Sequence, residues 1–442
     1  MKYIRQYPVL TILLLAFILR ITLFFIAKQQ GFTSFFLFDT YRYLNIGTHL
    51  FEDGLYAEKT GEPLFESVYV TPGAPVLFYL LRSLGGLEAI ILFQIFCQLV
   101  TCYFLIKTVK LLYPKFEKFS VLFCGILFAL DIPTMVLGNV IMTETVFTLL
   151  FFMFFYHFIL YLENNDTKNV LYASVFLGIS ALFRPIILYL PVFMLVYFLL
   201  RFSAVKKIQV KPLLYFFIPF YLLTGSWYFT NYKMHGHFFY SMVGEFNLLY
   251  FQAADIYAEV NGISVGEART ELYHKIQNSF DVSEYNHVDQ YIFYARGGEI
   301  ARKIIFENPV PFVKNLVRAN INLFFRPVRD YLKITLGSNE LFHTRSKDHS
   351  AFIRFSDYWQ IFINIVLFLL LFPGVIFLFR KNLSIGFFMT LLFFYFILVC
   401  SGPEIDGRFR VPLVPVILAN ACAGVVLILE KIRKKSYRLS SI

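Results

Sequence analysis

The sequence predicts an all-α polytopic membrane protein with about ten transmembrane helices. Of the 442 residues, 58% are hydrophobic and 20% are aromatic, whereas only 16% are charged. The mean hydropathy of +0.63 points the same way, because soluble domains carry about a quarter charged residues. The basic residues also gather at the ends of apolar runs, where they act as topology signals.

The apolar runs are close to the length that a helix needs to cross a hydrocarbon core of about 30 Å. The first lacks a small-residue cleavage site, so we expect it to remain as a helix. Within 169–200, Arg184-Pro185 favours two crossings over one long helix, because a mid-membrane arginine is costly. The run 75–84 is expected to form a half-helix on the outer side. The expected spans are 8–27, 87–108, 119–136, 140–162, 169–183, 186–200, 212–229, 358–379, 383–400 and 411–429.

The distribution of basic residues predicts the orientation of the chain. Lys2 and Arg5 place the amino terminus in the cytoplasm, and the span count then places the basic tail there too. The segment 28–71 holds three basic and six acidic residues, as an outer loop can. We expect a multi-pass protein of a bacterial inner membrane, with both termini cytoplasmic.

Three regions follow from this topology. Residues 1–229 form an amino-terminal transmembrane module whose first outer loop, 28–86, is the candidate catalytic loop. Residues 230–355 form a large outer region, and 356–442 contain the last transmembrane helices and the basic tail. Amphipathic spacing predicts helices in the large outer region, with one apolar face at Val265, Ala268, Leu272, Ile276 and Phe280, and another at Phe312, Leu316, Ala319 and Leu323.

The charge and the cysteines exclude several classes of protein. The formal net charge is +11, but the basic residues form no patch interleaved with aromatic residues, so nucleic acid is not an expected partner. The five cysteines lie in or beside apolar segments without metal-ligand spacing. We therefore expect no disulfide framework, no metal site and no cofactor.

Asp39 is the leading candidate for a catalytic residue. It follows the first span, and Arg42 lies three residues further on, so both would project from one face of a helix. A carboxylate can accept a proton from a reacting group, and cations nearby can hold a phosphate on which charge builds. Arg184, Arg408 and Arg410 are further outer-side candidates for that phosphate, because guanidinium binds phosphate with fork geometry.

Asp39 and a second acid, Glu144, can each be interpreted as helix-end residues with a structural role. Asp39 suits the N-cap of a helix spanning 40–50, where backbone N–H bonds would make it a poorer base. Glu144 suits the first turn of a helix, where the helix dipole favours an acid. Arg20 lies inside the first span, where it would pair with a buried acid or extend to the interface, and we assign it no role in the reaction.

Several motifs in order resemble the GT-C glycosyltransferases that use polyprenyl-phosphate sugars, among them the protein O-mannosyltransferases and the lipid A aminoarabinose transferases of glycosyltransferase family 39. Asp39, Arg42 and Tyr43 match the acidic-x-x-Arg-Tyr pattern of the first outer loop. Where many relatives have Asp-Glu, this chain has Asp39-Thr40, so a role of that glutamate cannot be transferred. The other matching segments are Thr71-Pro72-Gly73-Ala74-Pro75, Thr143-Glu144, Arg184-Pro185, Trp227 with Asn231, and Arg408-Phe409-Arg410-Val411-Pro412.

The resemblance implies an inverting transferase that uses a lipid-linked sugar as donor. Asp39 would be the catalytic base, and Arg42, Tyr43, Glu144, Arg184, Arg408 and Arg410 would line the site for donor phosphate and substrate. The acceptor would be a glycolipid, a glycan or a protein on the outer side, with membrane lipids around the chain. A transporter or flippase of lipid-linked sugars and an oligosaccharide ligase or polymerase are the alternatives.

Overall fold

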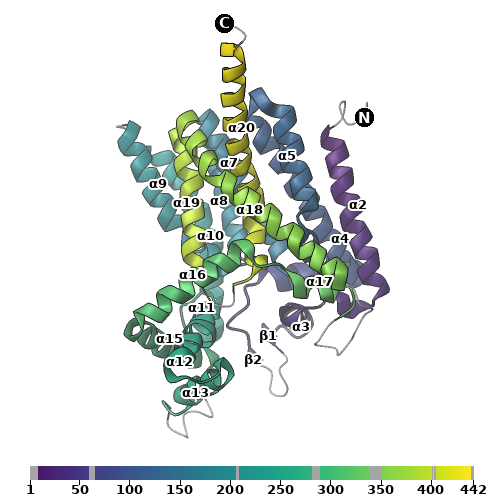
Figure 1. Ribbon diagram of the computed structural model, residues 1–442. Coiled ribbons are helices and arrows are strands. Elements are labelled where there is room, and N and C mark those ends of the chain that lie inside the picture. The colour runs from purple at the N-terminus through teal and green to yellow at the C-terminus, as the bar shows by residue number, and fades with distance from the viewer. Residues whose placement is uncertain are drawn as a thin grey trace.

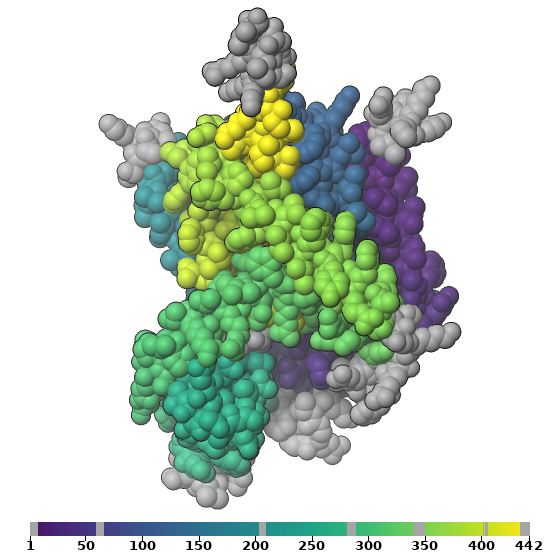
Figure 2. Space-filling view, viewed as in Figure 1, coloured from purple at the N-terminus to yellow at the C-terminus, as the bar shows by residue number. Residues whose placement is uncertain are grey.

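The computed structural model describes residues 8–58, 65–205, 209–280, 289–338, 350–400, 402 and 405–439. A bundle of long helices makes up the larger part of the molecule, and a body of shorter helices projects from one end of it (Figures 1 and 2). The bundle contains α2 (Pro8–Gln29), α4 (Gly73–Leu112), α5 (Glu117–Leu130), α6 (Ile132–Leu137), α7 (Glu144–Asn164), α8 (Lys168–Ala181), α9 (Leu190–Val205), α10 (Val210–His235), α18 (Ser350–Lys381), α19 (Leu383–Val399) and α20 (Val414–Leu439).

Two segments lie at the other end of the bundle from the start of α2 and the end of α20 (Figure 1). The first outer segment contains η1 (Phe32–Phe35), α3 (Phe38–Glu52), and the strands β1 (Ala57–Glu58) and β2 (Phe65–Glu66), which pair antiparallel. The second contains α11 (Val243–Asn247), the π-helical turn η4 (Leu248–Ala253), α12 (Ala254–Asn261), α13 (Val265–Gln277), α15 (Gln290–Glu307), α16 (Pro309–Phe325) and α17 (Arg329–Thr335). Three 3-10 turns complete the described elements, η2 (Pro114–Phe116), η3 (Pro185–Ile187) and η6 (Gly407–Leu413).

Each of the ten predicted apolar runs overlaps at least one helix of the bundle. In the described part of the chain, 7 helical segments are long and apolar enough to cross a membrane by length and composition. The remaining predicted spans correspond to α5 and α8, of 14 residues each, and α19, of 17 residues. The predicted all-α membrane fold is confirmed, with the two short strands as its only described sheet.

The prediction of one continuous span over 119–136 is wrong, because two helices divide this run. Helix α5 ends at Leu130, and Asp131 takes an extended backbone conformation with its side chain accepting a hydrogen bond from the Thr134 amide at 3.0 Å. Asp131 is therefore the N-cap of the short helix α6, with Pro133 in its first turn. Since α7 begins only at Glu144, the segment between α6 and α7 leaves helical conformation inside the bundle.

A buried arginine stabilises the place where α5 stops. Arg20 is fully buried, and its guanidinium donates to the carbonyls of Phe128 and Ala129 at 3.2 Å each. Its Nε donates to the side chain of Gln98 at 2.5 Å. The last carbonyls of a helix have no partner within the helix and must find one elsewhere when no water is present. Arg20 supplies those donors, and its described hydrogen bonds go to carbonyl and amide oxygens rather than to an acid.

Two turns follow the sequence prediction. Helix α4 is interrupted at Gly85 and Gly86, which have non-helical backbone angles, with φ +70° at Gly86. This break separates the predicted half-helix from the predicted span that follows. The run 169–200 is divided into α8 and α9 around Arg184, whose backbone is extended at φ −144° and ψ 120°. A residue that precedes proline is disfavoured in the helical region, so Pro185 fixes this turn.

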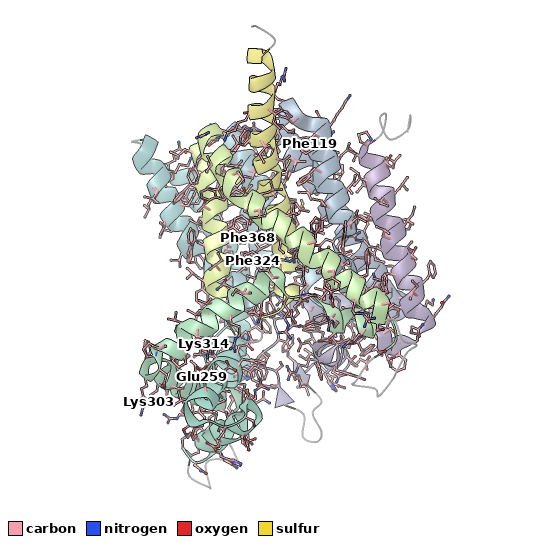
Figure 3. The ribbon with its side chains drawn as sticks, in the orientation of Figure 1. Phe119, Glu259, Lys303, Lys314, Phe324 and Phe368 are labelled. Atoms are coloured by element: carbon pink, nitrogen blue, oxygen red, sulfur yellow. The ribbon has the colours of Figure 1, made fainter. Side chains whose placement is uncertain are left out.

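The predicted amphipathic helices of the second outer segment are present. Ala268, Leu272 and Ile276 are buried on one face of α13, as are Ala319 and Leu323 on α16. The polar side of α16 reaches α12 through Lys314 and Glu259, which are 2.7 Å apart, and its far end packs Phe324 against Phe368 of α18 (Figure 3). The boundaries differ from the prediction, because α10 continues to His235 and α18 already begins at Ser350.

Candidate active site

Asp39 lies in the first turn of α3 but does not cap it. The helix begins at Phe38, and its N-cap position is Leu37. The Leu37 amide donates instead to the hydroxyl of Thr40 at 2.9 Å. The N-cap interpretation of Asp39 is therefore wrong, and Thr40 performs the capping role. Among the described residues, the contacts of the Asp39 carboxylate are ion pairs with Arg42 and Arg408, and its side chain is 34% exposed.

Thr40 also connects α3 to the segment that precedes Glu144. Its buried hydroxyl donates to the carbonyl of Ile141 at 2.9 Å, and the Ile141 amide donates to the Phe35 carbonyl at 2.9 Å. From the other side, the Gln94 side chain of α4 donates to the Val140 carbonyl at 2.8 Å. These bonds satisfy backbone groups of the non-helical segment before α7, which is buried inside the bundle. As a result, the positions of Asp39 and Glu144 are tied together.

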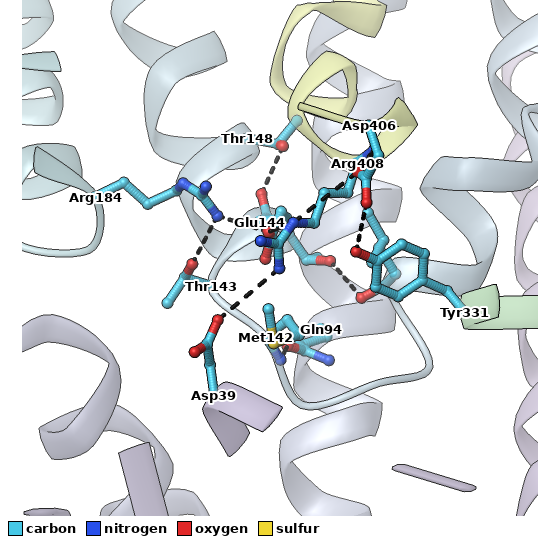
Figure 4. A network of polar contacts seen from close by, with 12 residues as sticks. Asp39, Gln94, Met142, Thr143, Glu144, Thr148, Arg184, Tyr331, Asp406 and Arg408 are labelled. Atoms are coloured by element: carbon cyan, nitrogen blue, oxygen red, sulfur yellow. Dashed lines mark hydrogen bonds and ion pairs between the residues drawn. The ribbon is translucent and has the colours of Figure 1, made fainter. Parts of the chain in front are cut away.

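Glu144 is a fully buried acid in the first turn of α7, as the helix-dipole interpretation predicts. Its Oε1 lies 2.6 Å from Nη1 of Arg184, whose side chain is 17% exposed. The same nitrogen donates to the Thr143 hydroxyl at 3.1 Å (Figure 4). A buried carboxylate is tolerated only when it is paired, so Arg184 and Glu144 form one unit at this end of the bundle.

The guanidinium of Arg408, in η6, lies between three carboxylates without a short contact to any of them. Its Nη1 is 3.9 Å from Asp39, and its Nε is 3.9 Å from Glu144 and 4.0 Å from Asp406 (Figure 4). Among the described residues, Nε has no hydrogen-bond partner although it is buried. Buried polar groups are nearly always hydrogen-bonded. Arg408 therefore keeps donor capacity that an anionic ligand could use.

The ring of Phe409 holds the two guanidinium groups together. Arg184 lies 5.4 Å and Arg408 4.8 Å from its ring centroid. Both distances are within the range in which a cation is attracted to the face of an aromatic ring. The middle residue of the Arg408-Phe409-Arg410 motif thus lets two cations approach one site, where Glu144 offsets part of their repulsion.

Arg42, one helical turn after Asp39 in α3, is a second cation beside the Asp39 carboxylate. It lies 3.7 Å from Asp39 and 3.2 Å from Glu58, and its guanidinium stacks over Tyr69 at 5.5 Å. Glu58, at the end of β1, also accepts a hydrogen bond from Ser67 at 2.7 Å. Arg42 therefore fixes the loop around Asp39 and, like Arg408, contributes positive charge beside its carboxylate.

Tyr43 lies one residue beyond Arg42 and packs edge-on against Phe78. Burial raises the pKa of the Tyr43 phenol, and the nearby carboxylates of Asp39 and Glu144 raise it further. The phenol therefore stays protonated at neutral pH. Tyr43 can serve this region as a hydrogen-bond donor but not as a base.

Arg410 points away from Asp39 and Glu144. Its Nη2 lies 3.2 Å from Asp131, and its Nη1 donates to the side chain of Asn364 on α18. Asp131 also accepts hydrogen bonds from the Thr134 hydroxyl at 2.6 Å and from Gln360 at 3.1 Å. These contacts give Arg410 a structural function, because they join η6 to α6 and α18 inside the bundle.

Other motif residues have packing functions. Trp227 and Asn231 of α10 donate to backbone carbonyls of the following loop, the indole to Tyr240 at 2.9 Å and the amide to Phe239 and Tyr240 at 3.0 Å. A Cβ on Gly73 would lie 2.7 Å from the Leu182 carbonyl oxygen, so glycine is needed where α4 meets the turn that carries Arg184.

Three residues near the site were not singled out in the sequence. Asp406 stands two residues before Arg408, an arrangement that indicates a cap, and its carboxylate does accept from the Arg408 amide at 2.8 Å. Glu58 is one of several acids in the first outer loop, and Tyr331 comes from α17 in the second outer segment. No sequence motif marks either of them, because Glu58 meets Arg42 through the fold of the first outer segment, and Tyr331 meets Asp406 across 75 residues.

The arrangement combines one partly exposed carboxylate with two convergent guanidinium groups at the end of the bundle where the outer segments lie. Among the described residues, no group of three or more His, Cys, Asp or Glu side chains is placed to hold a metal ion. A carboxylate can accept a proton, and paired arginines can bind a phosphate with charge-assisted hydrogen bonds. The site therefore has the groups that transfer from a phosphorylated donor requires.

Comparisons with known proteins show what the chain is similar to. Residues 71–228 match the model of the dolichyl-phosphate-mannose-protein mannosyltransferase family. A search of curated proteins gave no match. This match covers about a third of the chain and agrees with the resemblance to the GT-C membrane glycosyltransferases that the motifs carry.

The structure is similar to that of an oligosaccharyltransferase of Archaeoglobus fulgidus, AglB. The form tethered to an acceptor peptide matches with a TM-score of 0.52 and 13% identity over 98% of this chain and 51% of that one. The complex with an inhibitory peptide and a dolichol-phosphate matches with a TM-score of 0.52 and 13% identity over 100% and 52%. The apo form gives 0.51 and 13% over 100% and 53%. The chain thus spans about half the length of these neighbours, and the likeness concerns the fold.

Proposed function

We propose that this chain transfers a sugar from a polyprenyl-phosphate donor to an acceptor hydroxyl on the outer side of the membrane, with inversion at the anomeric carbon. The observation that carries the proposal is the position of Arg408, whose guanidinium lies 3.9 Å from both Asp39 and Glu144. Asp39, the candidate base, thus lies beside Arg408, which also lies near the ion pair of Arg184 and Glu144. The setting we propose is a bacterial inner membrane with cytoplasmic termini.

The proposed reaction is a single displacement. The acceptor oxygen forms a bond to the anomeric carbon while the bond from that carbon to the phosphate oxygen breaks. Asp39 takes the acceptor proton, and the polyprenyl phosphate leaves with the bonding electron pair. Arg408 and Arg184 stabilise the charge that grows on the phosphate, since donors fixed before the reaction need no reorganisation. The scheme uses one carboxylate and no metal ion.

Two comparisons support a lipid-linked donor. The matched family is described by its use of dolichyl-phosphate-mannose, and one neighbouring structure contains a dolichol-phosphate. The other ligand in the neighbours is a peptide, so a protein acceptor stands beside a glycolipid or another glycan. The likeness to an oligosaccharyltransferase favours one alternative, transfer of a preassembled oligosaccharide, and transport of a lipid-linked sugar is another.

Transfer by purified protein in detergent tests the proposal, because transport cannot be scored there. A panel of polyprenyl-phosphate hexoses and pentoses, a lipid-linked oligosaccharide and a set of acceptors would be assayed for the release of polyprenyl phosphate. Asp39→Asn should lower kcat by at least about 100-fold, the usual size of a general-base contribution. Asp53→Asn is the matched control, because Asp53 ends the same helix and its side chain is 50% exposed.

Three results would overturn parts of the proposal. Transfer by folded Asp39→Asn at the wild-type rate would remove Asp39 as the base. Turnover of the lipid-linked oligosaccharide alone would favour the oligosaccharide alternative. Loss of transfer in a chelator, restored by a divalent cation, would show that the reaction needs a metal.

A further inference from the structure

The carboxylate of Asp406 can compete with a substrate phosphate for the guanidinium of Arg408. Its Oδ1 accepts from the Arg408 amide at 2.8 Å and lies 4.0 Å from Arg408 Nε. A small rotation of either side chain would turn this contact into a direct ion pair. Such a pair would use donors that a substrate phosphate needs, since each guanidinium N–H can serve only one strong acceptor at a time.

A tyrosine from the second outer segment holds Asp406 in its observed position. The hydroxyl of Tyr331 on α17 donates to Asp406 Oδ2 at 2.7 Å (Figure 4). Burial raises the pKa of the Tyr331 phenol, and although Arg408 opposes this, Asp406 and Glu144 add to it. Tyr331 therefore remains a donor at neutral pH, and its bond occupies the oxygen of Asp406 that would otherwise be free to turn toward Arg408.

Helix α17 is itself fixed against the bundle. Leu332 and Leu336 are buried in one apolar cluster with Leu23 of α2 and Val136 of α6. At its start, Arg329 pairs with Asp357 of α18 at 2.5 Å. Tyr331 therefore lies on a helix whose contacts with α2, α6 and α18 fix its position, and these contacts do not involve η6.

We propose that Tyr331 is a positioning residue that restrains Asp406 and so keeps Arg408 available for the phosphate of the donor. The second outer segment then sets the affinity of the site for phosphate through one hydrogen bond. This inference rests on the proposed function in one respect, the assignment of Arg408 to the donor phosphate. It adds that Asp406 opposes phosphate binding unless Tyr331 holds it.

Binding of farnesyl monophosphate to the purified full-length protein tests this inference without requiring turnover. Tyr331→Phe keeps the ring and removes the hydroxyl, and we expect it to weaken binding about tenfold, the usual effect of a hydrogen bond to a charged group. Lys333→Met is the matched control on the same helix, because in the described part of the chain Lys333 pairs with the exposed Asp330 and not with the site. Arg408→Gln should weaken binding in its own right.

The decisive variant is Tyr331→Phe combined with Asp406→Asn. An asparagine cannot form an ion pair with Arg408, so the double variant should bind farnesyl monophosphate within about twofold of Asp406→Asn alone. A purely structural role of Tyr331 would predict no such rescue. The inference is overturned if Tyr331→Phe binds like Lys333→Met, if the double variant stays as weak as Tyr331→Phe, or if the wild type does not bind.

The same measurements separate this inference from the proposed function. A wild type that binds farnesyl monophosphate, shows the predicted rescue and transfers no sugar would refute the proposed function alone. A wild type that transfers sugar while Tyr331→Phe binds normally would refute the inference alone.

Discussion

Removing the charge of Glu144 should destabilise the protein although the side chain keeps its shape in Glu144→Gln. The carboxylate is fully buried, 2.6 Å from Arg184 and 3.9 Å from Arg408. Breaking a buried ion pair by removing one partner costs about 3–5 kcal/mol. The two arginine side chains are 17% and 22% exposed, so water recovers part of that cost, and we expect the lower end, about 3 kcal/mol.

The expected change in melting temperature follows from the size of the chain. An unfolding entropy of about 2.1 cal/mol/K per residue gives roughly 0.9 kcal/mol/K for a chain of this length, so about 3 kcal/mol corresponds to about 3 °C. Thermal unfolding in detergent, followed by tryptophan fluorescence, measures this shift. Glu259→Gln is the matched control, because its pair with Lys314 has side chains 40% and 53% exposed and surface pairs contribute about 0–1 kcal/mol.

A double-mutant cycle shows whether the effect belongs to the pair. Arg184→Gln should also destabilise, and the double variant should cost less than the two single variants together, since each single change leaves one buried charge without its partner. Equal melting temperatures for Glu144→Gln and Glu259→Gln would refute the reasoning. Strict additivity of Glu144→Gln and Arg184→Gln would show that the two groups are not coupled.

Two further predictions concern the support of the site. Gly73→Ala should destabilise by about 1–3 kcal/mol through overpacking, because its Cβ would lie 2.7 Å from the Leu182 carbonyl oxygen. Gly225→Ala has open space at its Cβ and should be neutral or stabilising, so similar melting temperatures for the two variants would contradict this prediction. Asp131→Asn keeps an acceptor for the α6 cap but leaves Arg410, 3% exposed, without its charge partner, and should cost about 3–5 kcal/mol in thermal unfolding. Asp330→Asn, at a carboxylate 75% exposed, is its control, and an equal shift in both would show that the Arg410 pair contributes little.

The transmembrane helices were predictable because their signal is local. An apolar stretch of sufficient length has to form a helix inside a membrane, and Arg184-Pro185 marked a turn by the steric effect of proline on the residue before it. The prediction was wrong at 119–136, where the helix ends at Leu130. Asp131 lies in that run, but hydropathy averages over a single acid. An acid shortly before a proline, as in Asp131 and Pro133, is nevertheless typical of a helix end, and the structure confirms it, because Asp131 accepts from the Thr134 amide and caps α6.

The site was predictable in its residue types but not in its pairings. Asp39, Glu144, Arg184 and Arg408 do meet, because each follows or precedes a bundle helix at the same end of the molecule. Arg410 lies only two residues after Arg408 and has the same chemistry, yet it faces Asp131. Over such a short distance a 3-10 turn directs side chains to different sides, and the sequence does not state which one faces the site.

By itself, the sequence determined that the chain has the composition of a polytopic all-α membrane protein, where its apolar helices lie, and which polar residues flank them. These features depend on composition and on interactions between neighbouring residues. The tertiary structure decided that Thr40 rather than Asp39 caps α3, that Glu144 pairs with Arg184 and lies near Arg408, and that Tyr331 donates a hydrogen bond to Asp406. The physical reason is that buried charges and polar groups must find partners, and those partners come from helices far apart in the chain.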